Sequence, residues 1–213
     1  MGETILSSPP ATYMVDTNVF RYKAYNIGDL SAKDEQAKQQ HQLNAKGFFE
    51  KAFVETENRE AFIMASGETR QELSVQAHTL KKESKRYNKL LEKVQVEESE
   101  IPLELEYMLR DFSNYVRGKY PGALVSEGRS TNYLQTPDAR IFIHAYLNDA
   151  ILVTANIKDF FLYPLFFEKT EDDVLYDISS CQYEKILPTG REKIESDEFF
   201  QRLQEKMREF KGN

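Results

Sequence analysis

Cysteine is almost absent from this sequence: Cys181 is the only one among 213 residues. A single thiol cannot form a disulfide within the chain, so packing and hydrogen bonds must hold the fold together. Proteins of the reducing cytoplasm have this composition. We therefore expect a cytoplasmic protein.

Long apolar runs are also missing. No stretch approaches the roughly 18 consecutive apolar residues that a membrane-spanning helix requires. The opening "MGETILSSPP" has neither a cationic start nor an extended apolar segment, so we do not expect a secretory signal. The sequence predicts no membrane partner.

Several familiar binding motifs are lacking. The three histidines, His41, His78 and His144, are scattered and form no Cys/His zinc pattern. No P-loop and no G-x-G-x-x-G segment is present, and we find no internal repeat or low-complexity tract. These absences exclude the common zinc modules and the glycine-rich phosphate loops.

What the sequence does contain is typical of one globular domain. Fourteen Phe and twelve Tyr, with 40% hydrophobic residues, distinguish it from disordered chains, and its length is enough to bury a core. The net charge of −7 argues against broad nonspecific binding to nucleic acid. It is compatible with an acidic site that binds cations.

Short apolar segments alternate with amphipathic ones along the chain. We expect a mobile leader over 1–11 and strands over 12–16, 61–66 and 151–155, with a last strand near 182–187. Expected helices cover 17–26, part of 26–60, a segment from about 68 past 90 capped by Ser66, 102–120, 137–150 with Pro137 at its first position, and 191–213. This alternation predicts an α/β fold with a mostly parallel sheet.

Acidic and amide side chains follow the ends of the expected strands. Asp16 ends the first apolar run, Glu68 and Glu72 follow the second, and Asn156 and Asp159 follow the third. Another acid, Asp138, opens the helix that leads into the third strand. Because the carboxyl ends of parallel strands share one edge of a sheet, we expect these groups to gather there.

Gathered carboxylates repel one another and lose hydration, so protons or cations must compensate them. Hard oxygen ligands select Mg²⁺ or Mn²⁺, and these ions suit phosphodiester hydrolysis because they activate water and stabilise the leaving oxygen. Simpler interpretations exist for each residue: Asp16 and Asp138 could cap helices, Asn156 could form a turn, and either Glu68 or Glu72 could be a solvated helix residue. Thr17, Asn18 and Thr154 suit the task of orienting ligands.

Three segments together resemble a known family. "YMVDTNVF", the Glu-Leu pair of "TRQEL", and "PDARIFIHAYLNDAILVTANIKDF" look like the conserved regions of PIN-domain nucleases. The last segment is the most specific, with Asp-Ala at a helix start followed by an apolar run and Val-Thr-x-Asn-x-x-Asp-Phe. The resemblance extends over roughly residues 12–165.

The resemblance implies a three-layer α/β/α sandwich and a pocket that binds Mg²⁺ or Mn²⁺ and cleaves RNA, most often in the toxin of a toxin–antitoxin pair. Asp16, Glu72 and Asp138 match the first three site positions, and Asn156 occupies the fourth, with Thr154 in support. The family implies an antitoxin protein or a homodimer as partner. We place the domain at 12–190, followed by a C-terminal helix.

This sequence departs from the family pattern at two points. Asn156 carries no charge, which weakens a second metal site unless Asp159 substitutes for it. The distance between the first two acids is long, so residues 26–60 look like a helical insertion. The neutral Asn156, together with the acidic net charge, keeps open a non-catalytic PIN scaffold that binds RNA or a protein. The long spacing bears on the antitoxin assignment more than on the fold.

Two surface patterns have alternative interpretations. The basic run Lys81–Lys93 is either a solvated helix face or a track for RNA phosphates. The stripe Phe199, Phe200, Leu203, Met207 and Phe210 is either a face that docks on the core or a surface for a partner.

Overall fold

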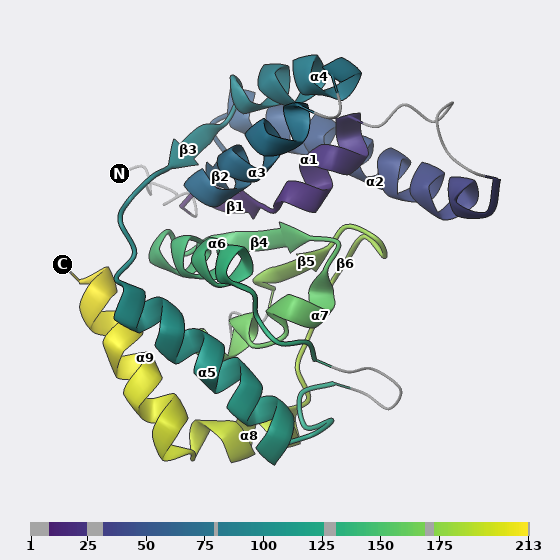
Figure 1. Cartoon of the computed structure of the whole chain (residues 1–213). Coiled ribbons are helices and arrows are strands. Elements are labelled where there is room, and N and C mark those ends of the chain that lie inside the picture. Colours follow the sequence, from purple (N-terminus) through teal and green to yellow (C-terminus); the bar gives the residue numbers. More distant parts are fainter. Residues whose placement is uncertain (1–8, 25–31, 79–80, 126–130, 169–172, 213) are drawn as a thin grey trace, which may run out of the picture.

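The structure is a computed structural model that describes residues 9–24, 32–78, 81–125, 131–168 and 173–212. Its centre is a six-stranded sheet in the order β3-β2-β1-β4-β5-β6 (Figure 1). The strands are β1 (Ala11–Val15), β2 (Ala61–Ser66), β3 (Gln95–Glu97), β4 (Ile151–Thr154), β5 (Leu175–Asp177) and β6 (Gln182–Tyr183). All neighbouring pairs are parallel except β5 and β6.

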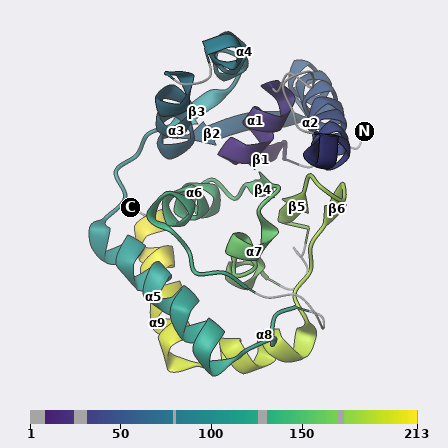
Figure 2. The ribbon, with the colours of Figure 1, turned by 45° about the vertical axis from the view of Figure 1, so that its right-hand side comes forward.

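Helices cover both faces of this sheet, which confirms the α/β fold with a mostly parallel sheet. Those of the first half are α1 (Thr17–Ala24), α2 (Ala32–Glu57), α3 (Gly67–Ala77) and α4 (Lys81–Leu91). Those of the second half are α5 (Leu103–Lys119), α6 (Thr136–Leu147), α7 (Ile157–Phe160), the 3-10 helix η2 (Tyr163–Phe166), α8 (Pro188–Glu195) and α9 (Glu198–Lys211). Figure 2 shows the two groups on opposite sides of the strands.

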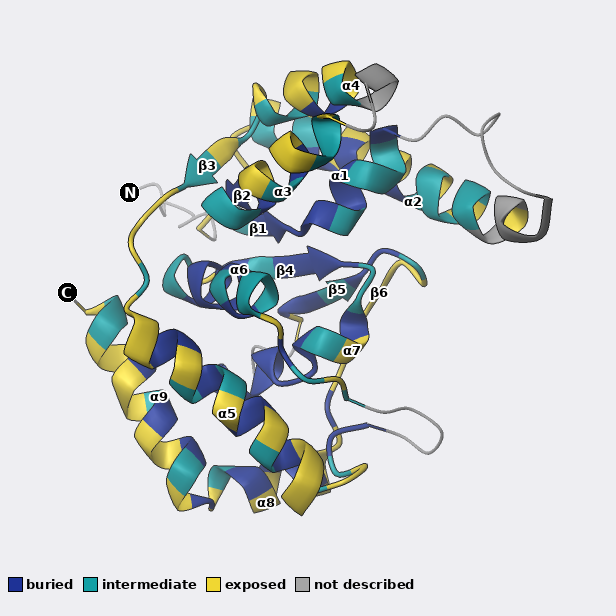
Figure 3. Cartoon of the chain, viewed as in Figure 1, coloured by how far each residue is buried: buried dark blue, intermediate teal, exposed yellow. Residues whose placement is uncertain are grey.

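Alternating side chains of the strands divide the core into two clusters. Met14 and Leu152 point into one cluster, which α5, α6 and α9 complete, whereas Val15 and Val153 point into the other, which α1 and α2 complete. Successive strand residues face opposite sides of a sheet, so both sides of a strand must be apolar when helices cover both. The central strands are accordingly buried along most of their length (Figure 3).

The sheet reverses its direction of growth at β1. From β1 the chain proceeds outward to β2 and β3, and it later returns to β4 on the other side of β1, with Val15 aligned with Val153. Open α/β sheets bind ligands in the crevice beyond the carboxyl ends of the two strands at such a point. In this protein those two strands lead directly to Asp16 and Asn156.

The helix that follows β2 starts as expected but ends early. Ser66 caps α3 by accepting a hydrogen bond from the Thr69 amide at 3.1 Å. The expectation of one helix running past residue 90 is wrong, because α3 ends at Ala77 and α4 begins at Lys81. The chain then adds the edge strand β3, which pairs on one side only and carries the charged Glu97, so its sequence gave little β signal.

The C-terminal segment also differs from the expected single helix. It forms α8 and α9, separated by Ser196 and by Asp197, whose side chain accepts a hydrogen bond from the Phe199 amide at 2.8 Å. An Asp N-cap starts a new helix because its carboxylate satisfies an amide that has no partner within the helix. The last strand expected near 182–187 is only Gln182–Tyr183, and it pairs with the unexpected β5.

The apolar stripe of α9 docks on the core. Phe200, Leu203 and Met207 are buried, and Phe199 and Phe210 pack partly buried against the same cluster. The Phe200 ring lies 5.6 Å from the Phe112 ring of α5. Of the two interpretations, the structure therefore supports core packing.

Two further expectations concern segments that lie partly outside the described residues. Residues 1–8 of the leader lie outside them, and β1 begins at Ala11. The expected helical insertion is represented by the long α2, while 26–31 lie outside the description. No helix in the described part of the chain is long and apolar enough to cross a bilayer.

Candidate active site

Asp16 is the most enclosed carboxylate at the carboxyl edge of the sheet. It is only 2% exposed, and its amide donates to the Val153 carbonyl at 3.0 Å. Its Oδ2 accepts hydrogen bonds from Thr154 Oγ1 at 2.7 Å and from Asn18 Nδ2 at 3.2 Å. Burial raises the pKa of Asp16 to about 6, with Glu72 adding to the rise and the Thr154 hydrogen bond opposing it.

Asp138 lies in the first turn of α6 and faces the same region. Burial is the largest cause that raises its pKa, to about 7, and the charges of Asp16, Asp159 and Glu72 raise it further. Four carboxyls from four different elements are thus close enough to repel one another. We call Asp16, Glu72, Asp138 and Asp159 the acid cluster.

The structure separates Glu72 from Glu68, the two alternatives on α3. Glu72 Oε2 accepts a hydrogen bond from Thr17 Oγ1, the residue after Asp16. Glu68 instead pairs with Arg140 Nη1 at 2.5 Å, and Arg140 Nε also binds Glu106 Oε2 at 2.8 Å. Glu72 therefore belongs to the acid cluster, whereas the charge of Glu68 is compensated by arginine.

Asn156 and Asp159 lie next to each other after β4. Asn156 Nδ2 donates to Asp159 Oδ2, and the Asn156 amide donates to Thr154 Oγ1 at 2.9 Å. Burial raises the pKa of Asp159, although hydrogen bonds from Asn132 and Asn156 lower it. The contact of Asn132 with Asp159 was not expected, because Asn132 is a polar residue in an expected loop and no motif distinguishes it.

The donor set of the acid cluster has the chemistry that Mg²⁺ and Mn²⁺ prefer. It offers carboxylate oxygens only. Burial raises the pKa values of Asp16 and Asp138, the neighbouring carboxylates raise them further, and a bound cation would offset both effects. Within the described ranges, however, no three His, Cys, Asp or Glu side chains are already arranged to hold a metal ion. Glu72 and Asp159 are hydrogen-bonded to Thr17 and Asn156, so a metal site would require these side chains to turn.

An open cavity of about 430 Å³ lies beside Asn156, the residue that binds Asp159, and no member of the acid cluster lines it. Asn156, Lys158 and Phe161 line one side, and Asp177 and Ser179 line the other. It gives a substrate room beside β4 and provides one cation, Lys158, at the lining.

The basic run on α4 is only partly available as a phosphate track. Arg86 Nη1 donates to the Ala24 carbonyl at 3.1 Å, and the Lys93 ammonium lies 5.3 Å from the centre of the Phe53 ring. Lys85 and Lys89 are exposed. The side chain of Lys82 lies outside those that are described.

This chain has little similarity to known proteins. No protein-family model and no curated protein matches the sequence. One similar solved structure is VapBC2 from Rickettsia felis bound to a DNA fragment from its promoter. The alignment has 17% identity and a TM-score of 0.43, and it covers 72% of this chain and 93% of the other. Similarity at this level assigns no activity to this chain.

Proposed function

We propose that this protein is a metal-dependent ribonuclease of the PIN type. The observation that carries the proposal is the buried Asp16 carboxylate at the switch point of the sheet, bound by Thr154 of β4, with Glu72 next to it on Thr17 and Asp138 near enough for these acids to raise its pKa. A fold keeps such a repulsive group only where something compensates it, and functional sites are the usual place. The motifs that resemble PIN nucleases contain these same residues.

Asp16, Glu72 and Asp138 would hold Mg²⁺ or Mn²⁺, with Asn156 and Asp159 completing the site. When bound, the cation would supply a water of lowered pKa and stabilise charge on the phosphodiester oxygens. Among the chain's own residues, Thr154 positions the Asp16 carboxylate. Thr17 and Asn132 do the same for Glu72 and Asp159, respectively.

The substrate would be RNA, entering through the cavity beside Asn156. Lys158 at its lining offers a positive charge to a phosphate, whereas Asp177 and Glu184 of the same lining and the net charge of the chain oppose binding. Because one lysine gives little attraction, we expect weak ground-state binding that falls with added salt.

The test is cleavage of a single-stranded RNA in the presence and absence of Mn²⁺. We expect Asp138→Asn and Glu72→Gln each to reduce the Mn²⁺-stimulated rate by at least about 100-fold, because each removes a charged ligand. Glu68→Gln is the matched control on the same helix and should keep most of the activity. Wild-type rates in both Asp138→Asn and Glu72→Gln would refute the proposal.

A second candidate function is a non-catalytic scaffold that binds RNA or a protein. It is favoured by the neutral Asn156, whose amide already satisfies Asp159, and by the absence of a formed metal site among the described side chains. Calorimetric titration with millimolar Mn²⁺ separates the two. No binding heat, together with retained RNA or protein binding, would favour the scaffold.

The role of a toxin in a toxin–antitoxin pair is a finer part of the proposal. It rests on the resemblance to PIN nucleases and implies an antitoxin or a second copy of this chain as partner. Expression of the chain in cells should arrest growth, and expression of the product of a neighbouring gene should restore it. Sedimentation of the purified chain would report a homodimer. Unaffected growth at high expression would argue against the toxin role.

A further inference from the structure

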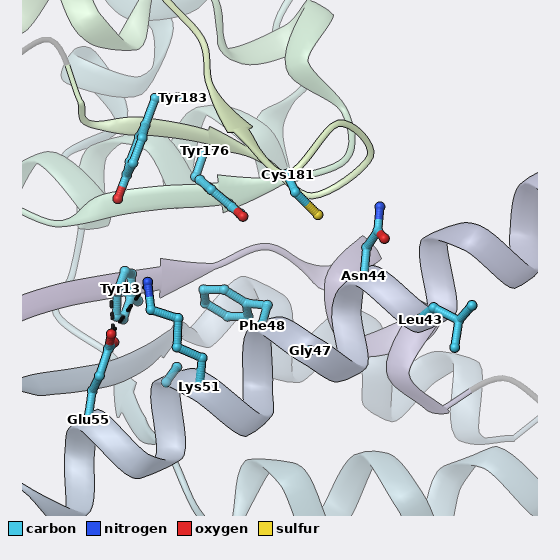
Figure 4. Close-up of a pocket in the computed structure, with 11 residues that line it drawn as sticks. Tyr13, Leu43, Asn44, Gly47, Phe48, Lys51, Glu55, Tyr176, Cys181 and Tyr183 are labelled. Carbon is cyan, nitrogen blue, oxygen red and sulfur yellow. Dashed lines mark hydrogen bonds and ion pairs between the residues drawn. The ribbon is translucent and has the colours of Figure 1, made fainter.

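A second cavity, of about 320 Å³, lies between α2 and the strands β5 and β6. Figure 4 shows side chains from the two sides facing each other across it: Tyr176 and Tyr183 from the strands and Cys181 from the turn between them, and Phe48 and Lys51 from the helix. No member of the acid cluster lines it. We call it the tyrosine pocket.

The tyrosine pocket is open partly because α2 has no side chain at Gly47. A Cβ placed at Gly47 would meet no atom within 4 Å, so this position faces free space. A glycine inside a helix costs roughly 1 kcal/mol relative to alanine, and nothing in the packing here demands one. The open space is therefore maintained at some cost in helix stability.

Aromatic rings form the walls of the tyrosine pocket. Tyr176 and Tyr183 meet edge to face with centroids 5.2 Å apart, and Phe48 lies 6.1 Å from Tyr176. Tyr183 is 38% exposed, which is unusual for a large ring next to a cavity. Exposed aromatic rings of this kind are suited to stacking against a planar ligand ring.

The two charged side chains of the tyrosine pocket, Glu55 and Lys51, lie together at one end. Glu55 Oε2 accepts a hydrogen bond from the Tyr13 hydroxyl at 3.0 Å, and Lys51 Nζ lies 3.5 Å from Glu55 Oε1. Burial, and then the hydrogen bond to Glu55, hold the pKa of Tyr13 well above its usual value, so this hydroxyl stays a donor. A carboxylate only accepts and still has free lone pairs, whereas an ammonium only donates.

We propose that the tyrosine pocket binds a guanine ring. Stacked on Tyr183, with Tyr176 at its edge, guanine would direct its N1–H and 2-amino donors to Glu55 and its O6 acceptor to Lys51. Adenine would place an acceptor nitrogen against the same carboxylate, and an acceptor facing an acceptor is rejected. Uracil offers the carboxylate one donor where guanine offers two, so the ordered pair of acceptor and donor favours guanine.

Two sources can supply this ring: a free guanine nucleotide or a base within single-stranded RNA. The proposal does not depend on the nuclease activity, since the tyrosine pocket and the acid cluster share no residue. Its failure would leave the acid cluster untouched, and loss of nuclease activity would leave the tyrosine pocket untouched.

Calorimetry with guanosine, inosine and adenosine monophosphates tests which base the tyrosine pocket prefers. We expect guanosine monophosphate to bind, the inosine compound to bind about tenfold more weakly because it lacks the 2-amino group, and adenosine monophosphate to bind weakest. The pentanucleotides r(UUGUU) and r(UUAUU) distinguish the source: tighter binding of r(UUGUU) than of the mononucleotide assigns an RNA base, and equal or weaker binding assigns the free nucleotide. No preference for guanine in either series would overturn the proposal.

Variants localise the binding. Glu55→Gln and Tyr183→Ala should each weaken the binding of guanosine monophosphate by about tenfold or more. Glu55→Gln removes the carboxylate acceptor, and Tyr183→Ala removes a stacking face. Glu50→Gln, on the same helix but exposed and paired with Lys46, is the matched control and should bind as the wild type does.

Gly47→Leu provides a test that does not depend on damaging the fold. The leucine would occupy open space and improve helix propensity, so this variant should melt no lower than the wild type yet bind no guanosine monophosphate. The ligand should also slow alkylation of Cys181, the only thiol in the chain, in the wild type and not in Gly47→Leu. Unchanged binding by a folded Gly47→Leu protein would overturn the proposal.

Discussion

Two enclosed aspartates, Asp138 and Asp197, have pKa values displaced in opposite directions. Burial tends to raise both. At Asp138 burial is the largest cause and the neighbouring carboxyls add to it, so that its pKa is raised to about 7. Asp197 accepts hydrogen bonds from Lys119, Tyr120 and Tyr115 at 2.7–2.9 Å, and these outweigh burial and hold its pKa well below its usual value. The groups that face a carboxyl thus decide whether it stabilises the fold.

The two aspartates should therefore respond to pH with opposite sign. The folded protein binds a proton at Asp138 more readily than the unfolded chain does, so the stability linked to Asp138 falls as pH rises from about 4 to about 7. The stability linked to Asp197 is present above about pH 4 and is lost as pH decreases below that value.

Removing the Asp197 carboxylate should produce the largest loss of stability. Asp197→Ala removes the N-cap of α9 and leaves two tyrosine hydroxyls and the Lys119 ammonium without their acceptor. We expect a loss of about 2–4 kcal/mol, or roughly 5–12 °C in melting temperature. Thermal unfolding at pH 7 measures it, with Glu198→Gln in the same helical turn as the control. Equal melting temperatures for Asp197→Ala and the wild type would contradict the comparison.

Neutralising Asp138 should have the opposite effect. Asp138→Asn removes a charge that burial and three other acids disfavour, so we expect a gain of about 1–2 kcal/mol at pH 8, after allowing for partial exposure to solvent. The gain should shrink at pH 5, where the wild-type carboxyl is already protonated. Melting curves of both proteins from pH 5 to pH 8 give this difference. A gain that is the same at both pH values would show that repulsion is not its cause.

Manganese should stabilise the protein in a way that depends on the acid cluster. Protons compete with the cation for the carboxylate oxygens, so we expect Mn²⁺ to raise the melting temperature more at pH 8 than at pH 6. At about 100 times the dissociation constant the gain is about 2.7 kcal/mol at most, and weak binding will make it smaller. Asp16→Asn should abolish the response. Stabilisation that persists in Asp16→Asn would place the cation elsewhere.

The smallest effect is expected at a glycine. Gly47→Ala should stabilise the protein by roughly 0.5–1 kcal/mol, since its Cβ meets nothing and alanine favours the helix. Gly190→Ala is the matched contrast, because a Cβ there would lie 1.8 Å from the Ala123 carbonyl oxygen and should destabilise α8. Denaturant unfolding of the pair measures both. Destabilisation by Gly47→Ala would show that the glycine is required by the fold.

The central strands and their helices could be predicted because several local signals agree. The segment 61–65 is apolar throughout, and Ser66 follows it as a cap, so β2 and the start of α3 were clear. The strands β3 and β5 could not be predicted in the same way. Each is three residues long, and both are defined by pairing with a neighbouring strand rather than by their own composition.

For the site, the sequence indicated which strand ends would meet, but not how individual side chains would be paired. Asp16 and Asp138 come together because the parallel strands β1 and β4 are neighbours in the sheet. The sequence motifs around these residues indicate that arrangement. Whether Glu68 or Glu72 joins the acid cluster depends on Arg140, which pairs with Glu68. These two residues are 72 positions apart in the sequence. The role of Asn132 depends likewise on a loop conformation that composition does not determine.

Arg140 has a consequence for how a cation could be accommodated. By binding Glu68 of α3 and Glu106 of α5 from its position on α6, it fastens three helices to one another. Drawing Glu72 and Asp138 together by sliding α3 along α6 would strain the Glu68–Arg140 ion pair, and the Glu106–Arg140 pair resists movement of the arginine. The last ångströms of approach must therefore come from rotation of the carboxylate side chains, while the helices that carry them remain a fixed frame.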